Sequence, residues 1–157
     1  MEMHNNLDSL TEEFRKRYDG MAQLCAEAEE AGRWDTEADG SMEGYAFAAL
    51  SGAILSLIVS DGNVGERETD YLNRTFGFDY TVDDLLSLYR FSARDLRENA
   101  VSNVGEAVRT LRASDEKAAE AFRALLTLAC RIIAESDDGL LEEESDLIRQ
   151  LTGAAEQ

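Results

Sequence analysis

Apolar side chains recur at intervals of three and four residues along most of the chain, which is the spacing of one face of an α-helix. The first such run predicts a helix over residues 7–31, which Gly32 would end. The same pattern predicts further helices over 43–60, 65–76, 82–90, 92–111, 115–136 and 141–152. Residues 43–60 are apolar on nearly every face, so this helix is expected to be central and buried.

Helix boundaries are predicted from residues that cap or stop helices. Thr81 and Ser114 each precede acidic residues, the pattern of a helix N-terminus. Ser92 is expected to begin a helix separate from 82–90, and the pattern allows a break near Gly105. Gly77 is expected to end the helix that starts near residue 65.

No segment alternates apolar and polar residues for long enough to predict a strand. With 157 residues, of which 44% are hydrophobic, the chain is expected to form an all-α, single-domain helical bundle of about seven helices, built from two related halves. Residues 1–42 are interpreted as an N-terminal helix and acidic linker, and 43–153 as the main helical domain. Trp34, in the linker, is expected to pack back on the body.

The two halves are inferred from a self-match at an offset of 76 residues, which aligns Ser60-Asp61 with Ser136-Asp137. At this offset the aligned acidic pairs are Glu66 with Glu142, Glu68 with Glu144, and Asp70 with Asp146. Each half contains an apolar helix, an Asp-Gly turn and a second helix that begins with acidic residues. The Asp-Gly pair is shifted by one residue in the second half, so either Asp137 or Asp138 corresponds to Asp61.

These acidic turns are the candidate site. Acidic residues at a helix start are stabilised by the helix dipole and need no functional explanation. Asp61 and Asp137 differ, because they follow a helix C-terminus, where the dipole disfavours an anion. Either each Asp caps the next helix, or a cation shared with a downstream Glu offsets the repulsion. Oxygen ligands favour Ca²⁺, Mg²⁺ or Mn²⁺. The candidate metal ligands are Asp61, Glu68, Asp137, Asp138 and Glu144. The spacing is not that of an EF-hand, since position 12 of the loop would be Leu72 or Ile148.

The net charge of −18 limits the kinds of molecule that the protein is expected to bind. It repels nucleic-acid phosphates and anionic membranes and suits cations, basic proteins or plain solubility. The N-terminus does not resemble a secretory signal, and no apolar run approaches a membrane span, so a cytoplasmic protein without direct membrane insertion is expected. Cys25 and Cys130 are expected to be buried free thiols.

Catalytic chemistry is not indicated. His4 is the only histidine, the two cysteines lack CxxC spacing, and no GxxxxGK[ST] or GxGxxG motif occurs, so the protein is not expected to be an enzyme. An aromatic set is expected to form a core seam between the halves, with a partner groove as the alternative; its members are Phe76, Phe78, Tyr80, Tyr89 and Phe91.

Segments 58–72 (IVSDGNVGERETDYL) and 134–148 (AESDDGLLEEESDLI) resemble the paired signature of the TerB-like tellurite-resistance family. The resemblance implies an all-helical fold, divalent-metal binding through acidic residues, and a role in membrane-associated stress response or phage defence; related modules are fused to DnaJ-type or ATPase proteins. Asp61 and Glu68 match the first motif and Asp138 the second, but the residue seven after Asp138 is Ser145, with Glu144 one position short.

The expected function is therefore that of a TerB-like, cation-binding module that also binds a protein partner. Two alternatives remain open. One is a metal-free adaptor or regulatory domain held together by core packing. The other is an acidic mimic of nucleic acid, which would spread its carboxylates along a surface stripe.

Overall fold

The computed structural model describes residues 2–59, 66–136 and 142–156, and these ranges form helices and connections without a strand. The helices are α1 (Glu2–Glu30), α2 (Thr36–Asp39), α3 (Met42–Val59), α4 (Glu66–Phe76), α5 (Val82–Ser114), α6 (Glu116–Ser136) and α7 (Glu142–Glu156). The predicted all-α helical bundle is confirmed, and most of its helix boundaries agree with the sequence pattern to within a few residues.

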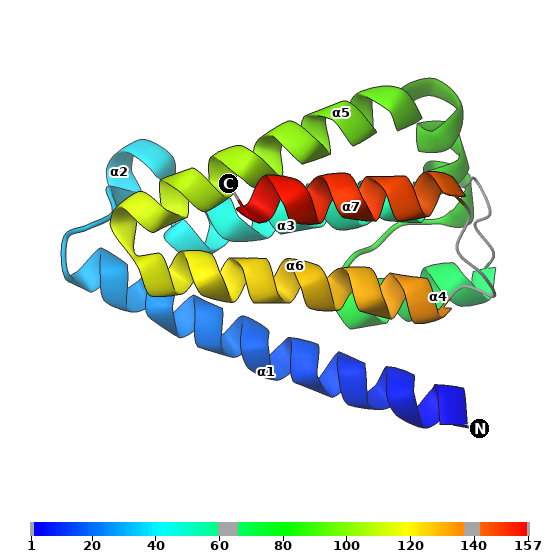
Figure 1. The fold of residues 1–157 in the computed structure, drawn as a ribbon, viewed down its shortest axis with the longest axis horizontal. Helices are drawn as coiled ribbons and strands as arrows, with labels where there is room; N and C mark the ends of the chain where they lie inside the picture. The colour runs from blue at the N-terminus through cyan, green and yellow to red at the C-terminus, as the bar shows by residue number, and fades with distance from the viewer. Residues whose placement is uncertain (1, 60–65, 137–141, 157) are drawn as a thin grey trace.

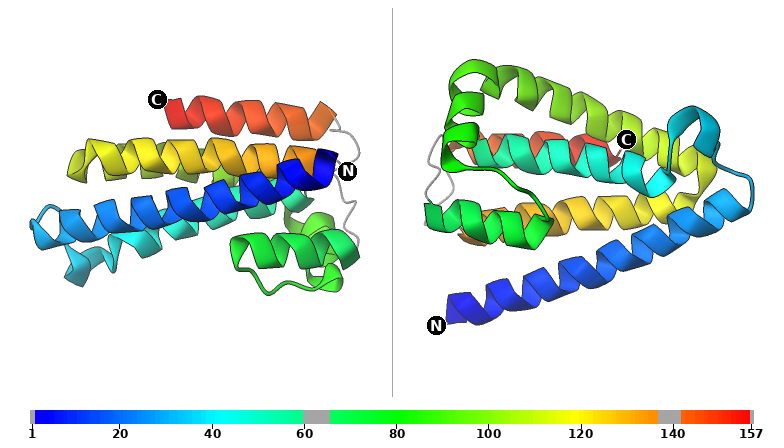
Figure 2. Two further views of the ribbon diagram at one scale, coloured as in Figure 1. Left: turned by 90° about the horizontal axis from the view of Figure 1, so that it is seen from below. Right: turned by 180° about the vertical axis from the view of Figure 1, so that it is seen from behind.

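The bundle is built around α3, which contacts α5, α6, α1 and α7 (Figures 1 and 2). α1 runs along α6, and α7 packs mainly along α5. The buried residues of α3 are Met42, Ala46, Leu50, Ala53, Ile54, Ser56, Leu57, Ile58 and Val59. The expectation that no apolar run approaches a membrane span is wrong by length and composition, because α3, among the described helices, is long and apolar enough to cross a membrane. In this structure 50% of it is buried inside the bundle.

The expectation of two helices within 82–111 is wrong, because α5 is continuous from Val82 to Ser114. Its axis changes direction near the N-terminal end, so the first turns and the long remainder point differently (Figures 1 and 2). Gly105 does not break the helix; it is buried, and a Cβ added there would lie 3.7 Å from the carbonyl oxygen of Ala154 in α7. The glycine therefore lies at the contact between α5 and α7, where an added Cβ would make ordinary van der Waals contact. The sequence pattern did not distinguish such a contact position from a break in the helix.

The connection between α1 and α3 packs against the body through Trp34, as expected. Gly32 ends α1 with a φ of 76°, and the Arg33 N–H donates back to the Ala28 carbonyl, the arrangement of a glycine helix stop. The Trp34 side chain is buried, and its Nε1 donates a hydrogen bond of 2.9 Å to the Gly40 carbonyl. Its ring centroid lies 5.4 Å from that of Tyr45, the fourth residue of α3.

One hydrophobic core joins the helices and contains both cysteines. Cys25 and Cys130 are buried and free, as expected. Burial raises the pKa of the Cys130 thiol to about 12, so the thiol stays protonated at neutral pH. It also raises the pKa of Cys25 to about 11, with a smaller contribution from nearby carboxylates, first that of Glu43.

The aromatic seam is partly as expected. Phe76 packs edge-on against Phe14 of α1 with ring centroids 5.1 Å apart, and Phe78 and Tyr80 extend the row of rings along the connection to α5. The seam thus reaches the N-terminal helix, which the sequence pattern did not indicate. The side chains of Tyr89 and Phe91 lie outside the described part of the structure.

Candidate cation site and the acidic end of the bundle

The structure describes the predicted ligands only in part. Asp61, Asp137 and Asp138 lie outside the described residues. Glu68 lies in the first turn of α4 and Glu144 in the first turn of α7, but their side chains are not among those described. The structure therefore describes the candidate site through the positions of the helices that border it.

Four helix ends that border the two acidic turns lie at one end of the bundle. α3 and α6 finish there, at Val59 and Ser136, and α4 and α7 begin there, at Glu66 and Glu142 (Figures 1 and 2). We call this the acidic end. The two turns are 76 residues apart along the chain, yet the helix ends that frame them belong to the same end of the molecule.

The two halves differ in how their second helices pack. α7 lies along α5, α6 and α3, whereas among the described residues α4 makes no comparably extensive contact with any helix. Among the α4 side chains that the structure describes, those of Thr69, Thr75 and Phe76 are buried. The internal repeat therefore corresponds to a shared order of helix, turn and helix, with different packing of the second helix in each half.

A cleft of about 370 Å³ lies between α4 and the start of α5. Its lining residues are Glu66, Thr69, Asp70, Tyr80, Thr81, Val82 and Asp83. The described lining residues thus supply three carboxylates and three hydroxyls, and none of these residues is basic. The sequence pattern explained Glu66 and Asp83 as acids at helix starts and Asp70 only as part of the repeat, and it did not predict a cleft. The sequence did contain one indication that these acids lie together, since Glu66 and Asp70 are four residues apart and therefore share one face of α4.

The carboxylates of this cleft do not form a ligand shell by themselves. No three of the His, Cys, Asp and Glu side chains that the structure describes come together closely enough to hold a metal ion. Ca²⁺ takes six to eight oxygen ligands, so a cation here needs further donors or water. What the described residues supply is a concentration of negative charge beside α4.

The expected capping is present at the start of α5, whereas at the start of α6 the cap is Asp115 and the expected Ser114 is the last residue of α5. Thr81 and Asp84 form a capping box at the start of α5, with the Asp84 N–H donating to Thr81 Oγ1 at 3.0 Å and the Thr81 N–H donating to Asp84 Oδ2 at 3.1 Å. At the start of α6 the Lys117 N–H donates to Asp115 Oδ1 at 3.0 Å. The carboxylates at these positions thus accept hydrogen bonds from backbone N–H groups. The same capping role is the alternative to metal binding for the carboxylates of the acidic turns.

Comparison with known proteins adds no assignment, since no family model, curated protein or solved structure matches the chain.

Proposed function

We propose that the protein is an acidic, TerB-like helical module that binds a divalent cation at its acidic end and uses that end to bind a protein partner. The observation that carries the proposal is the common location of the helix ends bordering both acidic turns (Figure 1). The proposed ligands are Asp61, Glu68, Asp137, Asp138 and Glu144.

Electrostatics supports a cation at this end. The chain carries a net charge of −18, and the cleft beside α4 brings together Glu66, Asp70 and Asp83. Carboxylates gathered in one region repel one another unless they take up protons or bind a cation. Carboxylate oxygens are the ligands of hard cations, so Ca²⁺, Mg²⁺ and Mn²⁺ are the ions proposed.

The biological setting proposed is a stress response, such as resistance to tellurite, or phage defence, because the resemblance of the two Asp-Gly motifs to the TerB-like family implies it. In this setting the cation would lower the net negative charge of the acidic end. A partner could then dock without facing the full repulsion of unneutralised carboxylates.

A metal-free adaptor is the second candidate. It is favoured by the capping roles of Thr81 and Asp115. In that case the acidic turns cap their helices, and salt affects the protein only by general screening.

Calorimetric titration of the metal-stripped full chain with Ca²⁺, Mg²⁺ and Mn²⁺ separates these candidates. A specific site should release or absorb heat, and an ion at about one hundred times its dissociation constant should stabilise the fold by about 2.7 kcal/mol. For a domain of this size that corresponds to a rise in melting temperature of about 5–10 °C.

The variant Asp61→Asn with Glu144→Gln should lose the heat and the rise in melting temperature. The matched control is Glu37→Gln with Glu116→Gln, which removes the same charge from α2 and the start of α6, at the other end of the bundle (Figure 1). If the wild type gives neither signal with any of the three ions, the cation site is refuted and the adaptor remains. If both variants respond like the wild type, the proposed ligands are wrong.

A further inference from the structure

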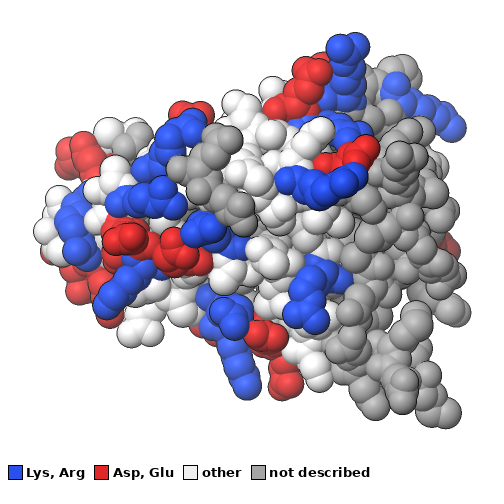
Figure 3. Space-filling view, viewed as in Figure 1, with Lys and Arg blue, Asp and Glu red and all other residues white. Residues whose placement is uncertain are grey.

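Positive charge is concentrated in one part of this acidic chain. Residues 90–133 contain eight Lys or Arg and six Asp or Glu, although the whole chain has a net charge of −18. In the space-filling view, Lys and Arg side chains lie over the face formed by α5, α6 and α7, interspersed with Asp and Glu (Figure 3). This face, unlike the acidic end, offers attraction to an anion.

A cleft of about 380 Å³ opens on this face, where α6 lies between α1 and α7 (Figure 1). Its lining residues are Glu13, Arg17, Glu120, Arg123, Ala124, Thr127, Leu128, Arg131, Thr152 and Ala155. The lining residues that the structure describes include three arginines and two glutamates, and none of them is aromatic. These described residues therefore carry net positive charge and offer no ring on which a base could stack.

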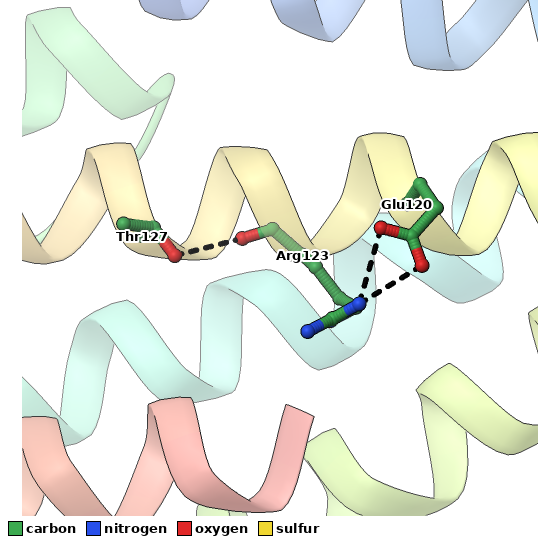
Figure 4. Close-up of polar contacts among 3 residues, drawn as sticks. All are labelled: Glu120, Arg123 and Thr127. Carbon is green, nitrogen blue, oxygen red and sulfur yellow. Dashed lines mark hydrogen bonds and ion pairs between the residues drawn. The ribbon is translucent and has the colours of Figure 1, made fainter. Parts of the chain in front are cut away.

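Two of the arginines are held by carboxylates of their own helix. Arg123 Nη1 donates to both carboxylate oxygens of Glu120, at 2.9 and 3.1 Å (Figure 4). Arg17 Nε donates to Glu13 Oε1 at 2.9 Å. Each guanidinium has five N–H donors, so these contacts orient the groups and occupy only part of their donor capacity.

Arg123 differs from an ordinary surface arginine. Its side chain is 29% exposed, whereas Arg94, which pairs with Glu98 in α5, is 90% exposed. Figure 4 shows its guanidinium extending from α6 toward the side on which α7 lies, and Thr152 and Ala155 of α7 line the same cleft. Arg131, two turns further along α6, extends the basic lining.

We propose that this cleft binds a small-molecule oxyanion, a phosphate or carboxylate group, through the guanidinium groups of Arg17, Arg123 and Arg131. Planar guanidinium forks match phosphate and carboxylate oxygens in pairs, which makes arginine suited to such ligands. Glu13 and Glu120 act as positioning residues for Arg17 and Arg123. The negative charge elsewhere on the molecule repels the ligand, so this face is the favoured approach.

The volume supports a small ligand. A cleft of about 380 Å³ lies at the lower end of the size range of small-molecule sites. Because the lining has a net charge of about one positive unit, a ligand with one or two negative charges is neutralised best. This site is separate from the acidic end, so it stands or falls independently of the proposed cation site.

The test is calorimetric titration of the full chain with inorganic phosphate, acetate and succinate, at constant ionic strength set with sodium chloride. At least one of these probes should bind, and Arg123→Gln with Arg131→Gln should weaken it at least tenfold. The control is Arg94→Gln with Arg149→Gln, which removes the same charge from exposed helix surfaces outside the cleft lining and should leave the affinity within about twofold. Circular dichroism of each variant verifies that the fold is kept.

Glu120→Gln separates positioning from charge alone. It makes the cleft more positive, so simple attraction would strengthen binding, whereas loss of the contact that orients Arg123 should weaken it. Strengthened or unchanged binding would overturn the positioning role of Glu120. If none of the three probes binds, or if the cleft variant and the control variant lose affinity equally, the anion site itself is refuted.

Discussion

Replacing Trp34 tests whether the connection between α1 and α3 is part of the folded core. The indole is 8% exposed, packs against Tyr45 and donates one hydrogen bond of 2.9 Å to the Gly40 carbonyl. Truncating a buried Trp to Ala costs about 3–5 kcal/mol in a closed core. Because Trp34 is close to the surface and its surroundings can adjust, about 3 kcal/mol is expected for Trp34→Ala.

The variant Trp34→Phe isolates the hydrogen bond. It keeps most of the ring contact with Tyr45 but leaves the Gly40 carbonyl without the indole donor, which should cost about 1 kcal/mol. At about 2–4 °C per kcal/mol for a domain of this size, the melting temperature should fall by about 6–12 °C for Trp34→Ala and by about 2–4 °C for Trp34→Phe.

Urea unfolding followed by far-ultraviolet circular dichroism measures both losses, with the slope against urea expected to stay unchanged. Ser102→Ala, at an exposed position of α5, is the control and should change stability by less than about 0.5 kcal/mol. If Trp34→Ala also stays within about 0.5 kcal/mol of the wild type, the packing of Trp34 does not stabilise the fold, and residues 31–41 act only as a linker between α1 and α3.

Two further predictions follow from backbone geometry and buried thiols. Gly20 lies inside α1 and Gly77 has a φ of 74°, and neither would bring an added Cβ within 4 Å of another group, so only the backbone distinguishes them. Thermal melting should show Gly20→Ala stabilising by about 1 kcal/mol and Gly77→Ala destabilising by about 1–2 kcal/mol, and equal signs would contradict the assigned conformations. Burial raises the pKa of the Cys130 thiol from 9.0 to about 12, so its contribution to stability is complete below pH 9 and is lost as the pH rises toward about 12. The fall in unfolding free energy across that range should be smaller in Cys130→Ala, and rapid reaction of native Cys130 with a thiol reagent at pH 8 would refute its burial.

Local signals were sufficient for most of the helices. The glycine stop at Gly32, the cap at Thr81 and the uninterrupted apolar character of 43–60 correspond to observed features of α1, α5 and α3. Each of these depends on residues within one or two turns of one another, so the sequence contains the whole interaction. The helix over 82–114 was divided wrongly because Ser92 and Gly105 look like boundary residues when their surroundings are unknown.

The candidate binding sites on the surface could be predicted from the sequence only in part. The acidic turns were found as a repeat of residue types, and the helix ends around them do lie at one end of the bundle. The cleft beside α4 and the arginine cleft were missed, because both combine residues from separate helices. Arg17 and Arg123, for example, are 106 positions apart and line one cleft only because α1 packs along α6.

By itself, then, the sequence determined the helices, their caps, the buried thiols and the strong negative charge, since all of these are set by composition and by neighbours along the chain. The tertiary structure alone decided that Gly105 is a contact between α5 and α7, that α4 and α7 pack differently, and that basic side chains of a −18 protein share one cleft. Those features arise from the way amphipathic helices cross and bury one another, and no periodic pattern in a single helix contains that information.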